Sequence, residues 1–102
     1  MQETTLLERT DNKLLDRYAN VLKALAHPIR MAIVDLLHTE KDGMTVTQIY
    51  EKLRLEQAVA SHHLGILRDK GVLEHYRTGK HTYYFLEKQY MQDIIRLVQQ
   101  TA

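Results

Sequence analysis

Ser61, His62 and His63 stand side by side in the stretch LEQAVASHHLGILRDKGVL, residues 55–73. A hydroxyl beside an imidazole is the residue set of a covalent nucleophile, and neighbouring histidines are typical metal ligands. Neither chemistry fits this spacing, because successive residues of a helix diverge by about 100° and cannot act on one atom. The sequence also holds no nucleophile elbow, phosphate loop or suitably spaced carboxylate pair. We therefore expect a protein that is not an enzyme and that carries no cofactor.

The remaining histidines do not form a convincing set of metal ligands. The chain has six histidines and no cysteine, which excludes thiolate metal sites, disulfides and thiol redox chemistry. His75 and His81 would face each other across a hairpin only if its loop had an odd number of residues. A structural zinc site normally needs four ligands. We expect no metal site.

Length and composition indicate one domain, residues 1–102, with 44% hydrophobic residues and a net charge of +1. The segment 44–86 is more basic than the whole, with six Lys and Arg against four Asp and Glu, and it holds four of the six histidines. No apolar run approaches the ~18 residues of a membrane span, and the first residues lack the order of a signal peptide. The cytoplasm is the expected location.

The helices and strands that must position these residues are predicted from hydrophobic periodicity and from residues that start or end helices. Pro28 suits the first turn of a helix, Thr45 is a good N-cap, and Gly71 is a natural helix stop. The segments VLEHYR and HTYYFL flank TGK and indicate a hairpin. Helices are expected over 5–26, 28–39, 45–54, 57–70 and 87–100, with the hairpin over 72–86. The third and fourth helices lie three or four residues apart, which is helix-turn-helix spacing. The predicted fold is mostly α with a β-hairpin wing (α+β), a winged helix-turn-helix.

The helix 57–70 has two unlike faces. Ala60, Leu64 and Leu67 share a face at spacing i, i+4, i+7 and belong to the core. The opposite face is small and polar and lacks long charged side chains, which suits a helix that enters a major groove about 12 Å wide. Its residues are Gln57, Ala58, Ser61, His62 and Gly65. His63 lies at the edge of the core face, where we expect it to pack and to hydrogen-bond within the domain.

The hairpin turn carries Arg77, Lys80 and His81, which could reach phosphates or a narrow minor groove. Taken alone, the polar helix face fits a solvated helix and the basic turn fits simple solubility. Together they favour double-stranded DNA as the partner. The alternative is a winged-helix module that binds protein through the same surface, and the salt dependence of binding separates the two.

Three segments carry a family resemblance. LKALAHPIRMAIVDLL, the recognition-helix stretch with Ser61, His63 and Leu64, and the wing segment GKHTYY resemble the ArsR/SmtB family of bacterial transcriptional repressors. The similarity covers roughly residues 18–87 and includes Arg30 in its first segment. The resemblance implies a homodimer joined by the first and last helices, an operator of two-fold symmetry, and repression relieved by an effector. That effector, a small molecule or a protein, is not named by the sequence.

The chain departs from the family pattern at several positions. Glu56-Gln57-Ala58 stands where Ser-Gln-Ser is usual, and Gly65 replaces a frequently basic residue. Both changes indicate weaker or differently specific DNA binding. The positions of one family metal site are Thr45 and Thr47, and those of the other are Lys88-Gln89-Tyr90 with a partner pair at or past Thr101. Hydroxyls do not replace thiolates for soft metals, so we expect no metal sensing at these sites.

These patterns predict two sets of contact residues. The expected DNA contacts are Thr45, Gln57, Ala58, Ser61, His62, Arg68, Arg77, Lys80 and His81. The closing helix is apolar on more than one face, which suggests a subunit interface. The expected homodimer contacts are Leu14, Tyr18, Val21, Met91, Ile94, Ile95 and Val98.

Overall fold

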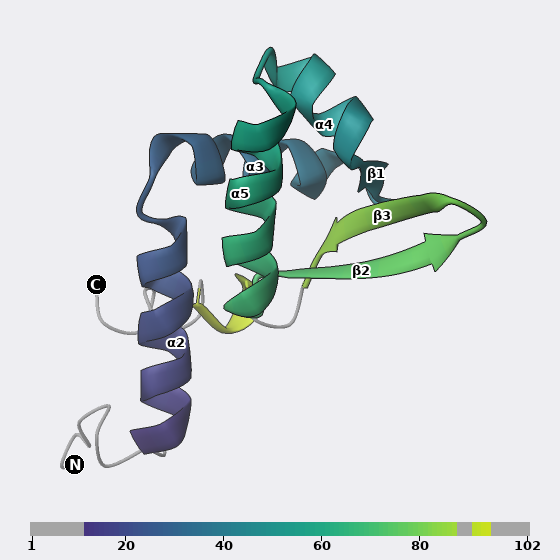
Figure 1. Cartoon of the computed structure of the whole chain (residues 1–102). Coiled ribbons are helices and arrows are strands. Elements are labelled where there is room, and N and C mark those ends of the chain that lie inside the picture. The colour runs from purple at the N-terminus through teal and green to yellow at the C-terminus, as the bar shows by residue number, and fades with distance from the viewer. Residues whose placement is uncertain (1–11, 88–90, 95–102) are drawn as a thin grey trace, which may run out of the picture.

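The computed structural model describes residues 12–87 and 91–94. In chain order the elements are α2 (Asn12–Leu25), α3 (Pro28–Thr39), β1 (Met44–Thr45), α4 (Val46–Leu53), α5 (Gln57–Asp69), β2 (Leu73–Thr78) and β3 (His81–Leu86). Residues 91–94 are helical. Figure 1 shows the helices gathered into one body and the hairpin β2–β3 extending away from it. The predicted winged helix-turn-helix is confirmed, and the short strand β1 is an addition to it.

The helix starts follow the local chemistry of the sequence. Pro28 occupies the first turn of α3, and the His27 side chain caps this helix by accepting a hydrogen bond from the Ile29 N–H at 3.1 Å. Thr45 caps α4 in a reciprocal capping box with Gln48. After α5, Gly71 adopts φ 79°, a left-handed conformation that suits glycine and turns the chain toward β2.

The three strands form an antiparallel sheet in the order β1-β3-β2. Thr78 pairs with His81, so the hairpin loop has two residues, Gly79 and Lys80. Gly79 has φ 61° whereas Lys80 has no positive φ, the pattern of a type II′ turn. On the other edge, Met44 pairs with Tyr84. Gly43 makes this pairing possible, because a Cβ there would lie 2.9 Å from the Tyr84 carbonyl oxygen.

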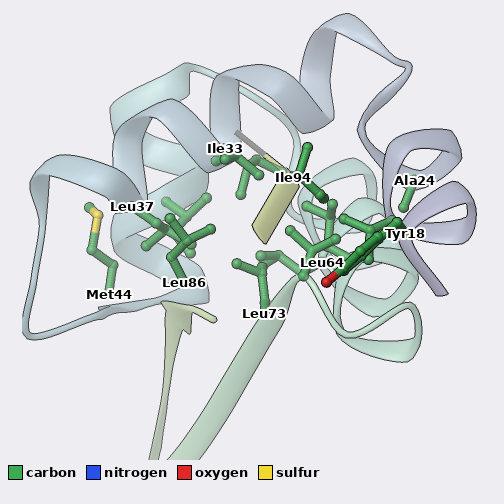
Figure 2. Packing of buried hydrophobic residues seen from close by; sticks show 14 residues of the cluster. Tyr18, Ala24, Ile33, Leu37, Met44, Leu64, Leu73, Leu86 and Ile94 are labelled. Atoms are coloured by element: carbon green, nitrogen blue, oxygen red, sulfur yellow. The ribbon is translucent and has the colours of Figure 1, made fainter. Parts of the chain in front are cut away.

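The core lies where α2, α3 and α5 meet the base of the hairpin (Figure 2). Its fully buried side chains are Val21, Ile33, Ile49, Leu64, Leu67, Val72 and Leu73. Burial of this apolar set fixes α5 against the body of the domain, so only one face of the helix remains available. None of the helices in the described part of the chain is long and apolar enough to cross a membrane.

Some expectations lie outside the described residues. They concern the start of the first helix before residue 12, most of the closing helix, and the interface positions Ile95 and Val98. Lys88, Gln89, Tyr90 and Thr101, which align with a family metal site, also lie there.

Candidate nucleic-acid interface

The exposed face of α5 is the one that the helical wheel predicts. Gln57, Ala58, Ser61 and His62 are all exposed, whereas Ala60, Leu64 and Leu67 are completely buried on the opposite side. The half-buried Gly65 lies further along the same side of α5, and a Cβ built there would meet nothing within 4 Å. The result is a shallow polar strip along α5, whose short side chains let the helix backbone approach a flat or grooved partner closely.

The first turn of α5 differs from the family pattern in its electrostatics. Glu56 is the N-cap residue, but its side chain makes no capping hydrogen bond. Its exposed carboxylate therefore lies beside the strip without being engaged at the helix start. A duplex brought to this end of α5 meets both the positive end of the helix dipole and this negative charge.

Thr45 is held from two directions at the start of α4. Its hydroxyl accepts a hydrogen bond from the Gln48 N–H at 3.2 Å, and its backbone pairs with Tyr83 of β3. The sequence predicts the cap but not the strand pairing. Thr45 thus joins the helix-turn-helix to the hairpin.

At the wing tip the basic residues are exposed, as expected from the Gly turn. The Arg77 Nε donates a hydrogen bond to the Gly79 carbonyl at 3.2 Å, which folds this guanidinium toward the turn. Lys80 occupies the loop itself, and His81 opens β3. His75 pairs with Tyr84 and not with His81, because the loop has an even number of residues. The two histidines therefore do not form a site across the hairpin.

The wing is stiffened by an aromatic contact that sequence reasoning missed. Tyr76 and Tyr83 are cross-strand partners whose rings stack at 5.3 Å with planes 12° apart. The Tyr76 hydroxyl also donates to the Asp42 carbonyl at 3.1 Å, which ties the hairpin to the loop before β1. The sequence predicted the hairpin but not the pairing of these two rings. The loop partner lies 34 residues away and left no local signal.

His63 lies on the inner side of α5, as the sequence predicts, and is 7% exposed. Its Nδ1 accepts a hydrogen bond from the Arg30 Nε at 3.2 Å, and its ring centroid lies 4.5 Å from that of His27. Burial is the main cause that lowers the pKa of His63 below its ordinary value, and electrostatic interactions with His27, Arg30 and His62 act in the same direction. Despite this clustering, no three or more potential ligands within residues 12–87 and 91–94 are arranged to hold a metal ion.

Arg68 is exposed at the far end of α5. It lies about 16 Å along the helix axis from Gln57, since each residue rises about 1.5 Å. It forms a surface ion pair with Asp69 at 3.5 Å. Such an exposed pair contributes little to stability and leaves Arg68 free to exchange partners.

The predicted interface residues occupy different environments. Tyr18, Val21 and Ile94 are 8%, 0% and 5% exposed and pack in the core of the single chain, so they offer little surface to a partner. Leu14 and Met91 are half-buried against that core. An apolar stripe that the prediction omitted runs along α2 at spacing i, i+4, i+7, and its most prominent member, Leu22, is 44% exposed. The residues of this α2 stripe are the half-buried Leu15 and the exposed Ala19 and Leu22.

Comparison with known proteins agrees with this geometry. A helix-turn-helix domain family matches residues 25–76. The transcriptional repressor PagR of Bacillus anthracis is 39% identical over 84 residues, covering 82% of this chain and 83% of that protein. Its crystal structure covers 86% of this chain and 99% of its own, with a TM-score of 0.75 and 38% identity.

Two further relatives connect the chain to a named family. The repressor SmtB of Mycobacterium tuberculosis is 32% identical over 83 residues, which cover 81% of this chain and 60% of that protein. The solution structure of a homodimeric winged helix-turn-helix domain from Mycobacterium bovis, described as a possible ArsR-family regulator, has a TM-score of 0.71. It is 29% identical and covers 99% of this chain and 89% of its own.

The fold and the exposed strip on α5 define a winged helix-turn-helix protein of the DNA-binding type. The chain belongs to the ArsR/SmtB family. Its relatives are transcriptional regulators and not enzymes, in agreement with the chemistry excluded from the sequence.

Proposed function

We propose that the chain represses transcription by binding double-stranded operator DNA as a homodimer, with α5 in the major groove. The observation that carries this proposal is the exposed strip on α5, which is polar and shallow while the opposite side is completely buried. A purely solvated helix would be expected to carry long charged side chains along this face. The repressors among its relatives support the same function.

Each residue of the strip has a role that its chemistry permits. Gln57 can pair with an adenine edge through its amide, and Ala58 can contact a thymine methyl group. Ser61 can bind a base or a phosphate, and His62 can donate to guanine or phosphate. We assign base reading to these four residues because they share the exposed face of α5.

The wing tip provides contacts of a different kind. Lys80 and His81 flank the end of a two-residue loop, and Arg77 lies on the strand before it. Cations on a projecting turn reach the phosphate backbone or a narrow minor groove, where they carry little sequence information. We place Thr45 and Arg68 at the backbone as well, at the start of α4 and the end of α5.

We propose that the dimer forms along α2 and the closing helix. The α2 stripe supplies exposed apolar surface for this contact, together with the half-buried Leu14 and Met91. Two-fold pairing would place the two α5 helices in successive major grooves about 34 Å apart and would require an inverted-repeat site.

Metal ions are not expected to act as effectors at the family positions. Thr45, which occupies one of these positions, uses its hydroxyl to cap α4, and Thr47 offers no thiolate. This donor set does not fit a soft metal. Adding zinc, nickel or arsenite at stoichiometric levels should leave the operator affinity unchanged, and a tenfold loss in a binding titration would contradict this expectation.

The function is tested by selecting bound fragments from genomic DNA and measuring their affinity over a range of salt concentrations. A repressor of this kind selects a small set of inverted repeats, and its binding weakens by decades as salt rises. Failure to enrich any sequence, with protein ligands binding through α5 instead, would favour a protein-interaction module. We place this activity in the cytoplasm.

A further inference from the structure

Two motifs of the sequence, one around Arg30 and one around His63, meet in the fold although they lie 33 residues apart. The Arg30 Nε donates to the His63 Nδ1 at 3.2 Å. The Nη1 atom of the same guanidinium donates to the Ala24 carbonyl at 3.1 Å. One planar side chain therefore joins the last turn of α2 to the middle of α5.

The start of α3 belongs to the same cluster. The His27 ring lies 4.5 Å from the His63 ring, and the His27 Nδ1 accepts the hydrogen bond that caps α3. The Arg30 side chain, which starts from α3, thus hydrogen-bonds to both α2 and α5, and His63 of α5 contacts both Arg30 and His27. Half-buried Arg30 directs two of its donors inward, which is not the arrangement of a side chain extended toward solvent.

The position of His63 on α5 allows its hydrogen bond with Arg30 to control the rotation of the helix. His63 lies one residue after His62 and two residues after Ser61, so around the helix axis it points about 100° away from His62 and about 200° away from Ser61. A contact at that angle restrains the rotation of α5 about its own axis. With side-chain tips about 5.5 Å from the axis, a rotation of about 10° moves them by about 1 Å. That displacement exceeds the whole distance range of a good hydrogen bond.

We propose that Arg30 is a positioning residue that sets the orientation of α5 relative to the end of α2. Because α2 carries the proposed dimer contact, the same link sets the spacing between the two recognition helices of a dimer. This inference rests on the proposed function. It assigns Arg30 to aligning the DNA-reading helix, and not to direct contact with phosphate or to stability alone.

The test uses the full-length chain and an inverted-repeat duplex obtained by the selection described above. Affinities are measured for this duplex, for two duplexes with one base pair inserted or removed between the half-sites, and for a random-sequence duplex. Thermal unfolding of each variant is recorded in parallel. Spacing preference, the ratio between the selected and the respaced duplexes, is a readout that a loss of stability alone does not change.

Arg30→Lys keeps the charge but not the planar pair of donors. We expect it to lower affinity for the selected duplex by roughly 2- to 30-fold, the range for residues that modulate coupling without touching a ligand. Affinity for the random duplex should stay the same, and the spacing preference should flatten.

Substitutions at the other end of the hydrogen bond separate its components. His63→Leu removes the acceptor and should reproduce the effect of Arg30→Lys. His63→Gln restores an acceptor and should recover most of the spacing preference. His38→Leu, at an exposed histidine of α3, is the matched control and should leave every ratio unchanged.

Three results would overturn the inference. The first is that Arg30→Lys and His63→Leu leave the spacing preference intact. Alternatively, Arg30→Lys could weaken all duplexes equally, which identifies a phosphate contact. The third result applies if Arg30→Lys does not fold: equal spacing preferences in His63→Leu and His63→Gln would then contradict the inference. A wild-type chain that prefers no duplex at all would instead overturn the proposed function.

Discussion

Substitution of Lys80 and substitution of Ser61 should weaken DNA binding in different ways. Lys80 lies in the wing loop, whereas Ser61 lies on α5. Lys80→Gln removes a cation that we place near the phosphate backbone while keeping a side chain of similar length. Log affinity falls linearly with log salt concentration, and each phosphate contact makes this decline steeper by about 0.9. A homodimer contains two copies of Lys80, so the slope should fall by about 1.8.

This change in slope has a measurable size. Between about 50 and 200 mM salt, a fourfold range, the wild-type protein should lose about 12-fold more affinity than Lys80→Gln. The loss of binding should be similar for selected and random sequences. Fluorescence anisotropy of labelled duplexes over this salt range gives both quantities. Lys23→Gln, at the last turn of α2, is the control for a general effect of charge.

Ser61→Ala should show the opposite behaviour. Loss of a base contact is worth about 1–3 kcal/mol at each half-site, so affinity for the selected operator should fall by tenfold or more. The salt slope should not change, because no charge is removed. If Lys80→Gln altered the preferred sequence while Ser61→Ala did not, the roles assigned to wing and helix would be wrong.

Leu22→Glu on the α2 stripe should give monomers in light scattering, since Leu22 is 44% exposed and its replacement leaves the core intact; a stable dimer would exclude this stripe, and Asn20→Glu on the far side of α2 is the control. Gly65→Ala should raise the free energy of unfolding by up to about 1 kcal/mol, because the added methyl group meets nothing within 4 Å and glycine disfavours a helix interior; a lower melting temperature would contradict this. The depressed pKa of His63 means that the unfolded chain binds a proton more readily, so stability is fully present above pH 6.5, the ordinary value, and is lost as pH falls toward the pKa of the folded protein. Denaturant unfolding between pH 7 and pH 5 should therefore show a decline that is reduced in His63→Gln, and equal slopes for the two proteins would refute the link to His63.

Helices and wing could be predicted from the sequence because their signals are local. The cap at Thr45, the proline in the first turn of α3, the turn at Gly79 and the buried spacing of α5 each act on residues only a few positions away. Strand β1 could not be predicted, because two residues carry no alternation and its partner β3 begins 36 residues later. Long-range pairing of this kind depends on the assembled fold.

The candidate site was predictable to a similar extent. The wheel separated the exposed face of α5 from its buried face, and it placed His63 correctly, but it did not identify Arg30 as the hydrogen-bond partner. The interface residues show a second limit of periodicity. An apolar face on α2 indicates that something covers it, but Tyr18 and Val21 are covered by the chain itself. The adjacent stripe has the same period, and its members Ala19 and Leu22 remain exposed.

The pairing of β1 with β3 makes the start of α4 and the wing one mechanical unit. Thr45 caps the helix and pairs with Tyr83, while Tyr76 holds the hairpin to the loop at Asp42. In the proposed complex, the groove widths and the curvature of the duplex must therefore conform to a nearly fixed template. A sequence that resists this deformation binds less tightly even where no side chain touches its bases. The protein would then discriminate among operators partly by the flexibility of their DNA.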